Sequence, residues 1–318
     1  MKTALICRAG GQSGVYLSRL LLEKRSPCFW HDKGRSRRQL CKPAARGVRE
    51  RVSLLSMASE DFRIVFMALK ACQPDEVYFL AGQSSVRWSF EQPAETIQSF
   101  TLGTLNVLEA CRMMDKSIRQ YHAGSSECFG DTAGVPANEA TPFSPRSPYA
   151  VAKASAYWLV NNYREAHGLY ACTGILFNHE SPLRPNRFVT RKIVDSAVRI
   201  ANGSGEKLTL GRLNIVRDWG WAPEYVDAMW RMLQQKVPAD FVIATGVSVS
   251  LEDFVREVFL SLGLDWREHV ESDTKLFRPS DIDWSQGDAS LAKACLGWEA
   301  HTKMPELVKL MMEAARNQ

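Results

Sequence analysis

One candidate catalytic segment directly follows a predicted strand. Residues 118–123 form that strand, and Ser125, Ser126 and Glu127 come after it. Ligands of parallel α/β sheets bind beyond the carboxyl ends of the strands. The sequence therefore places two hydroxyl groups and one carboxylate at the edge of the sheet where a ligand binds.

A second candidate segment opens a predicted helix over residues 149–166. Tyr149 and Lys153 are four residues apart and share one face of that helix. A nearby ammonium group lowers the pKa of a phenol, so Tyr149 is a candidate base toward a hydroxyl group, and Ser125 can share that hydrogen bond. This spacing is common on purely structural helices. The glycine turn upstream and the Ser-Ser-Glu segment, in this order, favour a catalytic pair.

A glycine turn separates the first predicted strand (3–7) from the first predicted helix (15–23). Glycines at such a turn let a dinucleotide pyrophosphate approach backbone N–H groups at the positive end of the helix dipole. Gly11 and Gly14 are placed for this contact. Arg8 stands where the first glycine of the turn belongs, and its side chain either forces a different turn or lies beside the phosphates.

The segment after the first helix bears on the choice of cofactor. Residues 25–32 are a poor second strand because Pro27 lacks a donor for the ladder. An acidic residue at the end of that strand binds the NAD ribose, whereas Arg or Lys binds the NADP 2′-phosphate. Asp32 favours NAD. The residues that favour NADP are Lys33, Arg35, Arg37 and Arg38. Because the basic residues outnumber the single Asp, the sequence predicts NADP, with NAD the less favoured cofactor.

Strands and helices alternate along the first 177 residues. Further strands are predicted over 76–80 and 169–177, and further helices over 61–72 and 97–114. This alternation predicts a doubly wound, Rossmann-like α/β domain over 1–177. Prolines and short helices over 178–318 predict a smaller C-terminal substrate-binding lobe, with some segments returning to the sheet. The short helices are expected over 188–201, 223–234 and 251–262.

Composition narrows the class of protein. The 318 residues are 45% apolar and 24% charged, which is typical of globular chains and excludes disordered, collagen-like and disulfide-scaffold proteins. No apolar run approaches the roughly 18 residues of a membrane span, and the N-terminus lacks a signal peptide's apolar region, so a cytoplasmic protein is expected. The eight cysteines are scattered without metal-ligand spacing, so no metal site is predicted.

The positive charge is local. Residues 24–51 contain ten Lys or Arg against two acidic residues, a net +8, so the rest of the chain carries −3 of the total +5. No interleaved aromatic residues or helix-turn-helix pattern accompany this run, so a nucleic-acid partner is not expected. A solvated loop and a phosphate-binding edge both remain open.

Longer segments carry a family resemblance. With the glycine turn, the Ser-Ser-Glu segment and the Tyr–Lys pair, they resemble the extended short-chain dehydrogenase/reductase superfamily and, within it, the GDP-mannose 4,6-dehydratase family. These segments are residues 142–149, 174–182, 188–192, 217–220, 241–246 and 278–283. The match is dense from about residue 73 to the end and patchy over residues 1–60.

The resemblance implies roles for individual residues. It implies a catalytic set of Ser125, where the family has Thr, with Glu127, Tyr149 and Lys153. It implies cofactor contacts from Gly11, Gln12, Gly14, Arg35, Gln83, Tyr149, Lys153 and His179. It implies substrate contacts from Ser84, Glu127, Asn178, Lys192, Arg217, Arg278 and Asp281. Arg217 and Arg278 would face a diphosphate, and Asp281 would accept from ribose hydroxyls.

The implied activity is a hydro-lyase reaction that turns GDP-mannose into GDP-4-keto-6-deoxymannose by internal hydride transfer and loss of water, in a homodimer or homotetramer. Glu127 is the residue that distinguishes such a dehydratase from its relatives. Two alternatives stay open. One is a related nucleotide-sugar reductase or epimerase. The other is a sugar-nucleotide-binding homologue whose cofactor binding is impaired by Arg8.

Overall fold

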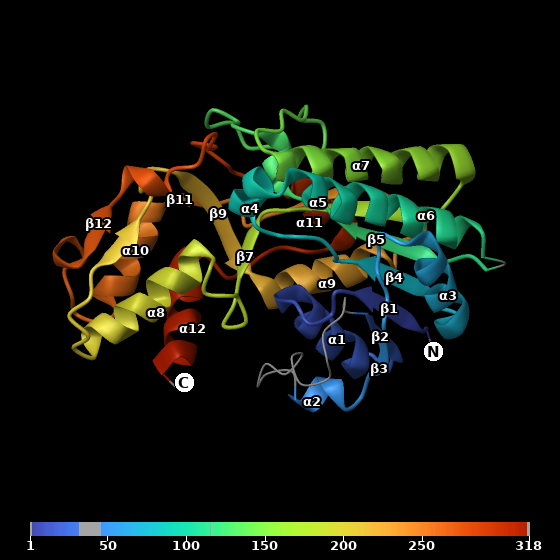
Figure 1. The fold of residues 1–318 in the computed structure, drawn as a ribbon, viewed down its shortest axis with the longest axis horizontal. Helices are drawn as coiled ribbons and strands as arrows, with labels where there is room; N and C mark the ends of the chain where they lie inside the picture. The colour runs from blue at the N-terminus through green and yellow to red at the C-terminus, as the bar shows by residue number, and fades with distance from the viewer. Residues whose placement is uncertain (1, 32–45, 115, 317–318) are drawn as a thin grey trace.

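The computed structural model describes residues 2–31, 46–114 and 116–316 (Figure 1). The predicted contributions of Asp32, Lys33, Arg35, Arg37 and Arg38 to cofactor choice lie outside the described residues. No helix within the described ranges combines the length and apolar character needed to cross a membrane.

The larger part of the chain is built on a seven-stranded sheet with the order β10-β6-β5-β4-β1-β2-β3, and all its strand pairs are parallel. Its strands are β1 (Ala4–Cys7), β2 (Cys28–His31), β3 (Ser53–Leu55), β4 (Glu76–Phe79), β5 (Arg119–Ala123), β6 (Ala171–Leu176) and β10 (Phe241–Ile243). The strand order reverses between β1 and β4, where doubly wound sheets bind their ligands.

Helices cover both faces of this sheet. Side chains alternate along β1, so Ala4 and Ile6 pack with one layer while Leu5 and Cys7 pack with the other. The first layer contains α1 (Gln12–Glu23), α9 (Ala222–Met232) and α11 (Ser290–Leu296). The second contains α3 (Phe62–Cys72), α6 (Gly103–Arg112) and α7 (Pro148–His167). The remaining helices of this part are α2 (Arg46–Arg49), α4 (Val86–Glu91) and α5 (Pro93–Ile97). The doubly wound fold is therefore confirmed.

The prediction that residues 25–32 form a poor strand is wrong. Cys28 to His31 pair in parallel with both β1 and β3. Pro27 precedes the first residue of β2 and contributes its carbonyl, which accepts from Ala4 N at 2.9 Å. The missing N–H therefore falls outside the ladder, a position that proline tolerates. Trp30 anchors the strand by donating to Ser18 Oγ at 2.6 Å.

A smaller lobe follows in the C-terminal half. It contains two small sheets, with orders β11-β9-β7 and β12-β8. Their strands are β7 (Asn178–Glu180), β8 (Leu208–Leu210), β9 (Val216–Trp221), β11 (Ser248–Ser250) and β12 (Val270–Ser272). Helices α8 (Val189–Ala201), α10 (Leu251–Leu260) and α12 (Met304–Arg316) enclose a separate apolar core around Trp219 and Phe254. Trp219 is thus a packing residue.

The boundary between the predicted units 1–177 and 178–318 stays a prediction. Strand β10 and helix α9 belong to the second unit in sequence, yet β10 pairs with β6 and α9 packs with α1. This is the expected return of C-terminal segments to the large sheet.

Candidate active site

The Ser-Ser-Glu segment forms a short helix at the end of β5. Ser125 is the N-cap of the 3₁₀ helix η3 (Ser126–Phe129), and its hydroxyl accepts from Glu127 N at 3.3 Å. Gly124 precedes it where a Cβ would lie 2.7 Å from Thr173 Cγ2. The close approach of β5 and β6 therefore fixes where Ser125 and Glu127 leave the sheet.

Tyr149 stands in the first turn of α7, facing Ser125. Ser147 caps this helix by accepting from Ala150 N at 3.1 Å, and Pro148 occupies the first turn, where its missing N–H costs nothing. The Tyr149 hydroxyl forms a hydrogen bond with Ser125. Burial raises the Tyr149 pKa, and the charge of Glu127 raises it further. The net shift is upward, because burial outweighs the lowering that was expected from the nearby Lys153 ammonium.

Lys153 lies one turn further along α7 and is buried. Its Nζ donates to the carbonyl of Ala123 at 2.6 Å. Burial lowers the pKa of Lys153 to about 7, and the positive charge of Arg8 lowers it as well. Charged Arg8 therefore acts on the candidate catalytic lysine from the glycine turn.

Arg8 has a backbone conformation that is usual for glycine. Its φ is +64°, in the left-handed region that favours glycine, so the backbone of the turn is strained at this residue. Gly11 N donates to Arg8 O at 3.2 Å, and a Cβ on Gly14 would lie 2.5 Å from Ala9 Cα. Gly14 is thus required by close backbone approach, whereas a Cβ on Gly11 would lie 3.4 Å from Arg8 O, an ordinary contact distance.

The residues at this turn fit a dinucleotide pyrophosphate. Gly11 is the N-cap of α1 and supplies no side chain to cap its first amides, which leaves the positive end of the helix for an anion. Gln12 is tied across to the β7 segment, because its Nε2 donates to His179 O at 2.8 Å and its Oε1 accepts from Ser181 Oγ at 2.7 Å.

Two other predicted cofactor residues border the same edge of the sheet. His179 Nδ1 lies 2.9 Å from Phe177 O and Nε2 lies 3.1 Å from Ser13 Oγ, while burial lowers the His179 pKa to about 4. His179 is therefore neutral at physiological pH. Gln83 follows β4, and its Nε2 donates to Ser85 O at 2.8 Å at the start of α4.

Three predicted substrate residues form a charged cluster in the lobe, in which Arg217 is buried and Arg278 is partly exposed. Arg217 Nη2 donates to Asp281 Oδ1 at 3.2 Å, and Arg278 Nη1 lies 3.4 Å from the same oxygen. Burial lowers the pKa of Arg217, an effect that the negative charges of Glu127 and Asp281 oppose. Asp281 thus pairs with two guanidinium groups, a role that the ribose prediction did not include.

The remaining predicted substrate residues belong to separate elements of the large sheet and the lobe. Ser84 follows β4, and Asn178 begins β7. Lys192 on α8 donates to Thr209 O at 2.6 Å, while burial and the nearby charge of Arg87 lower its pKa. Arg87, on α4, was not predicted from the sequence because it lies outside the quoted motifs.

Arg184 was not predicted as a site residue from the sequence. Its Nε lies 3.1 Å from Glu180 Oε2, and its guanidinium carbon lies 3.8 Å from the centroid of the Phe188 ring. Its positive charge lowers the pKa values of both Tyr149 and His179. The four-residue spacing from Glu180 was the signal available in the sequence.

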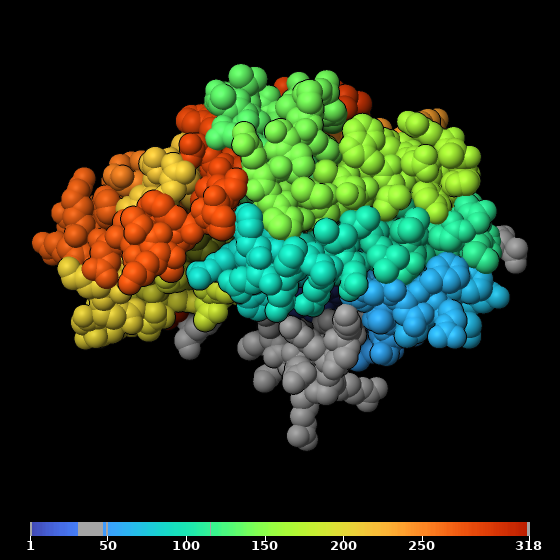
Figure 2. Space-filling view, turned by 45° about the horizontal axis from the view of Figure 1, so that its top comes forward, coloured from blue at the N-terminus to red at the C-terminus, as the bar shows by residue number. Residues whose placement is uncertain are grey.

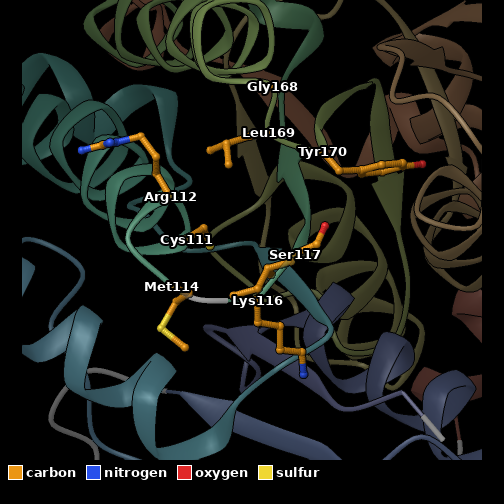
Figure 3. Close-up of a pocket in the computed structure, with 9 residues that line it drawn as sticks. Cys111, Arg112, Met114, Lys116, Ser117, Gly168, Leu169 and Tyr170 are labelled. Atoms are coloured by element: carbon orange, nitrogen blue, oxygen red, sulfur yellow. The ribbon is translucent and has the colours of Figure 1, made fainter.

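A surface pocket of about 270 Å³ lies at the opposite, amino edge of the sheet (Figure 3). It contains none of the predicted site residues. Its cations are already paired, because Arg112 contacts Glu109 and Lys116 lies 2.8 Å from Asp75 Oδ1. No cluster of three or more His, Cys, Asp or Glu side chains suited to a metal occurs in the described part of the chain.

The fold is shared with solved nucleotide-sugar enzymes. The structure of UDP-glucose 4-epimerase from Thermotoga maritima superposes with a TM-score of 0.88 over 99% of both chains, at 21% sequence identity. This likeness establishes a Rossmann-like sheet with a small mixed lobe, as expected from the sequence.

Sequence comparisons identify the family. The family model for GDP-mannose 4,6 dehydratase matches residues 5–311. The chain is 43% identical to GDP-mannose 4,6 dehydratase 1 of Arabidopsis thaliana, covering 98% of this chain and 89% of the relative. It is 41% identical to GDP-mannose 4,6-dehydratase of Sinorhizobium fredii, covering 96% and 94%. The chain therefore belongs to the GDP-mannose 4,6-dehydratase family, which confirms the resemblance drawn from its motifs.

Proposed function

We propose that this chain is a hydro-lyase that converts GDP-mannose to GDP-4-keto-6-deoxymannose. One observation carries the proposal: the short helix η3, which contains Glu127, packs against α7, which contains Tyr149 and Lys153. A candidate acid/base thus lies next to the helix that supplies the candidate base for the sugar hydroxyl, and its charge also acts on Arg217, a cation suited to the diphosphate. Family membership supports the same substrate.

Tyr149 takes the proton of the mannose 4-hydroxyl. To act as a base, the phenol must ionise, and its burial opposes this. The hydrogen bond from Ser125 and the positive charge of Arg184 both lower the Tyr149 pKa and favour the phenolate. Lys153 supplies a further positive charge one helical turn away.

Glu127 is the acid/base of the elimination step. Once C4 is a ketone, the neighbouring C5 hydrogen is acidic, and the Glu127 carboxylate removes it. This proton passes to the C6 hydroxyl, which leaves as water, so that a C5=C6 double bond forms beside the ketone. The proton that Tyr149 took from the 4-hydroxyl and the hydride stored from C4 are then returned to C5 and C6, so the net change is the loss of one water molecule. The hydrogen bond from Glu127 N to Ser125 Oγ holds this segment against the end of β5.

The two guanidinium groups of Arg217 and Arg278 bind the diphosphate, since forked cations pair well with phosphate oxygens. Lys192 and Asn178 provide further polar contacts to the substrate, and Ser84 contacts it from the end of β4.

NADP fits the turn of Gly11, Gln12 and Gly14, with Gln83, His179 and Lys153 along the sheet edge. When bound, the nicotinamide supplies reversible storage of the hydride from C4. The preference for NADP over NAD is drawn from the basic residues at 33–38, including Arg35.

Mass spectrometry of GDP-mannose incubated with the purified chain tests the function. The tubes contain NADP, NAD or no added cofactor. We expect loss of one water without net cofactor reduction, and the dependence on cofactor identifies the preferred dinucleotide. Unchanged GDP-mannose in every tube, despite measurable binding, would contradict the proposal.

The Arg8 backbone favours a second candidate function, a sugar-nucleotide-binding protein with impaired cofactor binding. Arg8 places a strained backbone and a cation at the dinucleotide turn. On this reading Arg8→Gly tightens NADP binding at least about tenfold. Arg25→Gly is a matched control, because Arg25 has φ +60° at the other end of α1. Equal NADP affinity in Arg8→Gly and the parent chain would rule out Arg8 as the cause.

We also propose a homodimer or homotetramer formed through the helices of one face. The segment that contains α4, α5 and α6 runs next to α7 on that face (Figure 2). Its exposed apolar side chains include Trp158 at 62%, Val151 at 43% and Leu102 at 39%. Sedimentation equilibrium should show a dimer or larger species that Trp158→Glu dissociates. Val237→Glu is the control, since Val237 is exposed in the loop after α9.

A further inference from the structure

Phe100 occupies an irregular turn between two helices. Residues Gln98–Leu102 form a π-helical turn, η2, that joins α5 to α6. Such turns are rare and occur frequently at functional sites, because the extra residue re-aims the side chains that follow. Thr101 Oγ1 donates to Ala152 O at 3.3 Å and ties the turn to α7.

The Phe100 ring contacts both members of the Tyr–Lys pair. Its centroid lies 5.3 Å from that of Tyr149 in a T-shaped arrangement with an interplanar angle of 88°. Lys153 Nζ lies 4.0 Å from the centroid of the Phe100 ring, within the range of a cation–π interaction. Phe100 is only 2% exposed, so solvent does not weaken this contact.

The Phe100 ring also packs against the loop that contains Gly82. Gly82, in the loop after β4, has φ +121°, and a Cβ placed on it would lie 2.0 Å from Phe100 Cε1. The ring therefore packs directly on the backbone of Gly82. Phe100 is held between this loop on one side and the Tyr149–Lys153 face of α7 on the other.

We infer that Phe100 is a positioning residue of the active site, whose ring holds the Lys153 ammonium and the Tyr149 side chain in their working arrangement. The inference deepens the proposed function, since it rests on Tyr149 and Lys153 being the catalytic pair.

Electrostatics explain why a ring is needed here. Among the described residues, the titratable groups that act electrostatically on Lys153 are Cys128 on η3, His122 on β5 and Arg8 in the glycine turn, and Tyr149 shares its face of α7. Burial raises the pKa of Cys128 to about 12 and lowers that of His122, so both are neutral near pH 7. None of these four groups is an anion there. The negative face of the Phe100 ring therefore joins the Ala123 carbonyl in stabilising the ammonium.

Titration of Lys153 by NMR tests the contact without requiring turnover. Lysine labelled with ¹³C at Cε is followed against pH, with the signal assigned by Lys153→Arg. Phe100→Leu should lower the Lys153 pKa by about one unit, because the cation–π contact favours the ammonium. Phe100→Tyr keeps the ring and should keep the titration of the parent chain. If Phe100→Leu does not fold, Phe100→Met removes the ring while filling the same space.

Phe259→Leu is the matched control. Phe259 is equally buried, but lies on α10 in the core of the lobe. It should lose stability without moving the Lys153 titration. An unchanged Lys153 pKa in Phe100→Leu or Phe100→Met, or an equal shift in Phe100→Tyr, would overturn the inference.

A kinetic readout connects the contact to the reaction. Less ammonium near pH 7 means less support for the Tyr149 phenolate, so Phe100→Leu should move the rising limb of the kcat–pH profile to higher pH and leave KM for GDP-mannose nearly unchanged. If Phe100→Leu lowers the Lys153 pKa but the parent chain shows no turnover, the placement of Phe100 holds and the proposed dehydratase function fails. If the parent chain turns over normally but Phe100→Leu leaves the Lys153 pKa unchanged, the proposed function holds and the placement of Phe100 fails.

Discussion

Arg217 Nη2 donates to Asp281 Oδ1 at 3.2 Å, and both side chains are less than a tenth exposed. The same carboxylate oxygen also accepts from Ile282 N at 3.0 Å and lies 3.4 Å from Arg278 Nη1. One oxygen therefore orients two guanidinium groups from different segments, strand β9 and the loop before Ile282. The pair of cations available to a diphosphate depends on this carboxylate.

Asp281→Asn should weaken substrate binding more than catalysis. Loss of the charge leaves Arg217 and Arg278 to repel each other, so KM for GDP-mannose should rise about tenfold while kcat changes little. Steady-state kinetics measure both values. Asp283→Asn is the control, because Asp283 pairs with Arg212 at the exposed rim. A fall in kcat at constant KM would show that Asp281 acts elsewhere.

Glu127→Gln should remove the elimination step. The amide keeps the size of the side chain but cannot take the C5 proton, so kcat should fall about 100-fold to 1,000-fold. Binding of GDP-mannose, measured by calorimetry, should stay close to that of the parent chain. Glu165→Gln is the control, because Glu165 is exposed on α7 and its substitution should leave kcat unchanged. Turnover that survives in Glu127→Gln would assign the proton transfer to another residue.

Gly82→Ala should be strongly destabilising. Its Cβ would lie 2.0 Å from Phe100 Cε1, and φ is +121°, so both the ring and the backbone would have to move. We expect the free energy of unfolding in urea to fall by about 3 kcal/mol. Gly134→Ala is the matched control, because Gly134 has φ +84° with nothing near its Cβ position. That variant should lose only about 1 kcal/mol. Equal losses in both variants would mean that the Phe100 contact contributes nothing.

Lys153→Met should abolish activity and stabilise the fold near neutral pH. The pKa of Lys153 falls from 10.5 to about 7 on folding, so the unfolded chain binds its proton more tightly. Below about pH 7, Lys153 therefore lowers the free energy of unfolding by its full amount. This destabilisation becomes smaller as pH rises and disappears near pH 10.5. Lys153→Met should gain about 2 kcal/mol at pH 7. Unfolding in urea at several pH values measures the gain, which should shrink as pH rises. A gain that does not depend on pH would contradict the lowered pKa.

Local patterns predicted much of this molecule. The strand, turn and helix around Gly11 and Gly14, and the shared face of Tyr149 and Lys153, depend on short-range backbone geometry that residue types reveal directly. The motifs were sufficient to predict the family. Pro27 misled the prediction of β2, because whether a proline removes a ladder bond depends on where the strand begins, and pairing with β1 decides that.

The tertiary structure alone decided how distant segments meet. Nothing in the sequence near Phe100 indicates that a π-helical turn aims its ring at Lys153, or that the loop at Gly82 supports it from behind. The sequence also could not show that Arg8 would adopt a glycine conformation. The pKa of Tyr149 is raised, against the sequence-based expectation, because burial outweighs the effect of a neighbouring ammonium on the same helix. Spacing along the chain determines which residues share a face, but desolvation depends on everything that packs over that face.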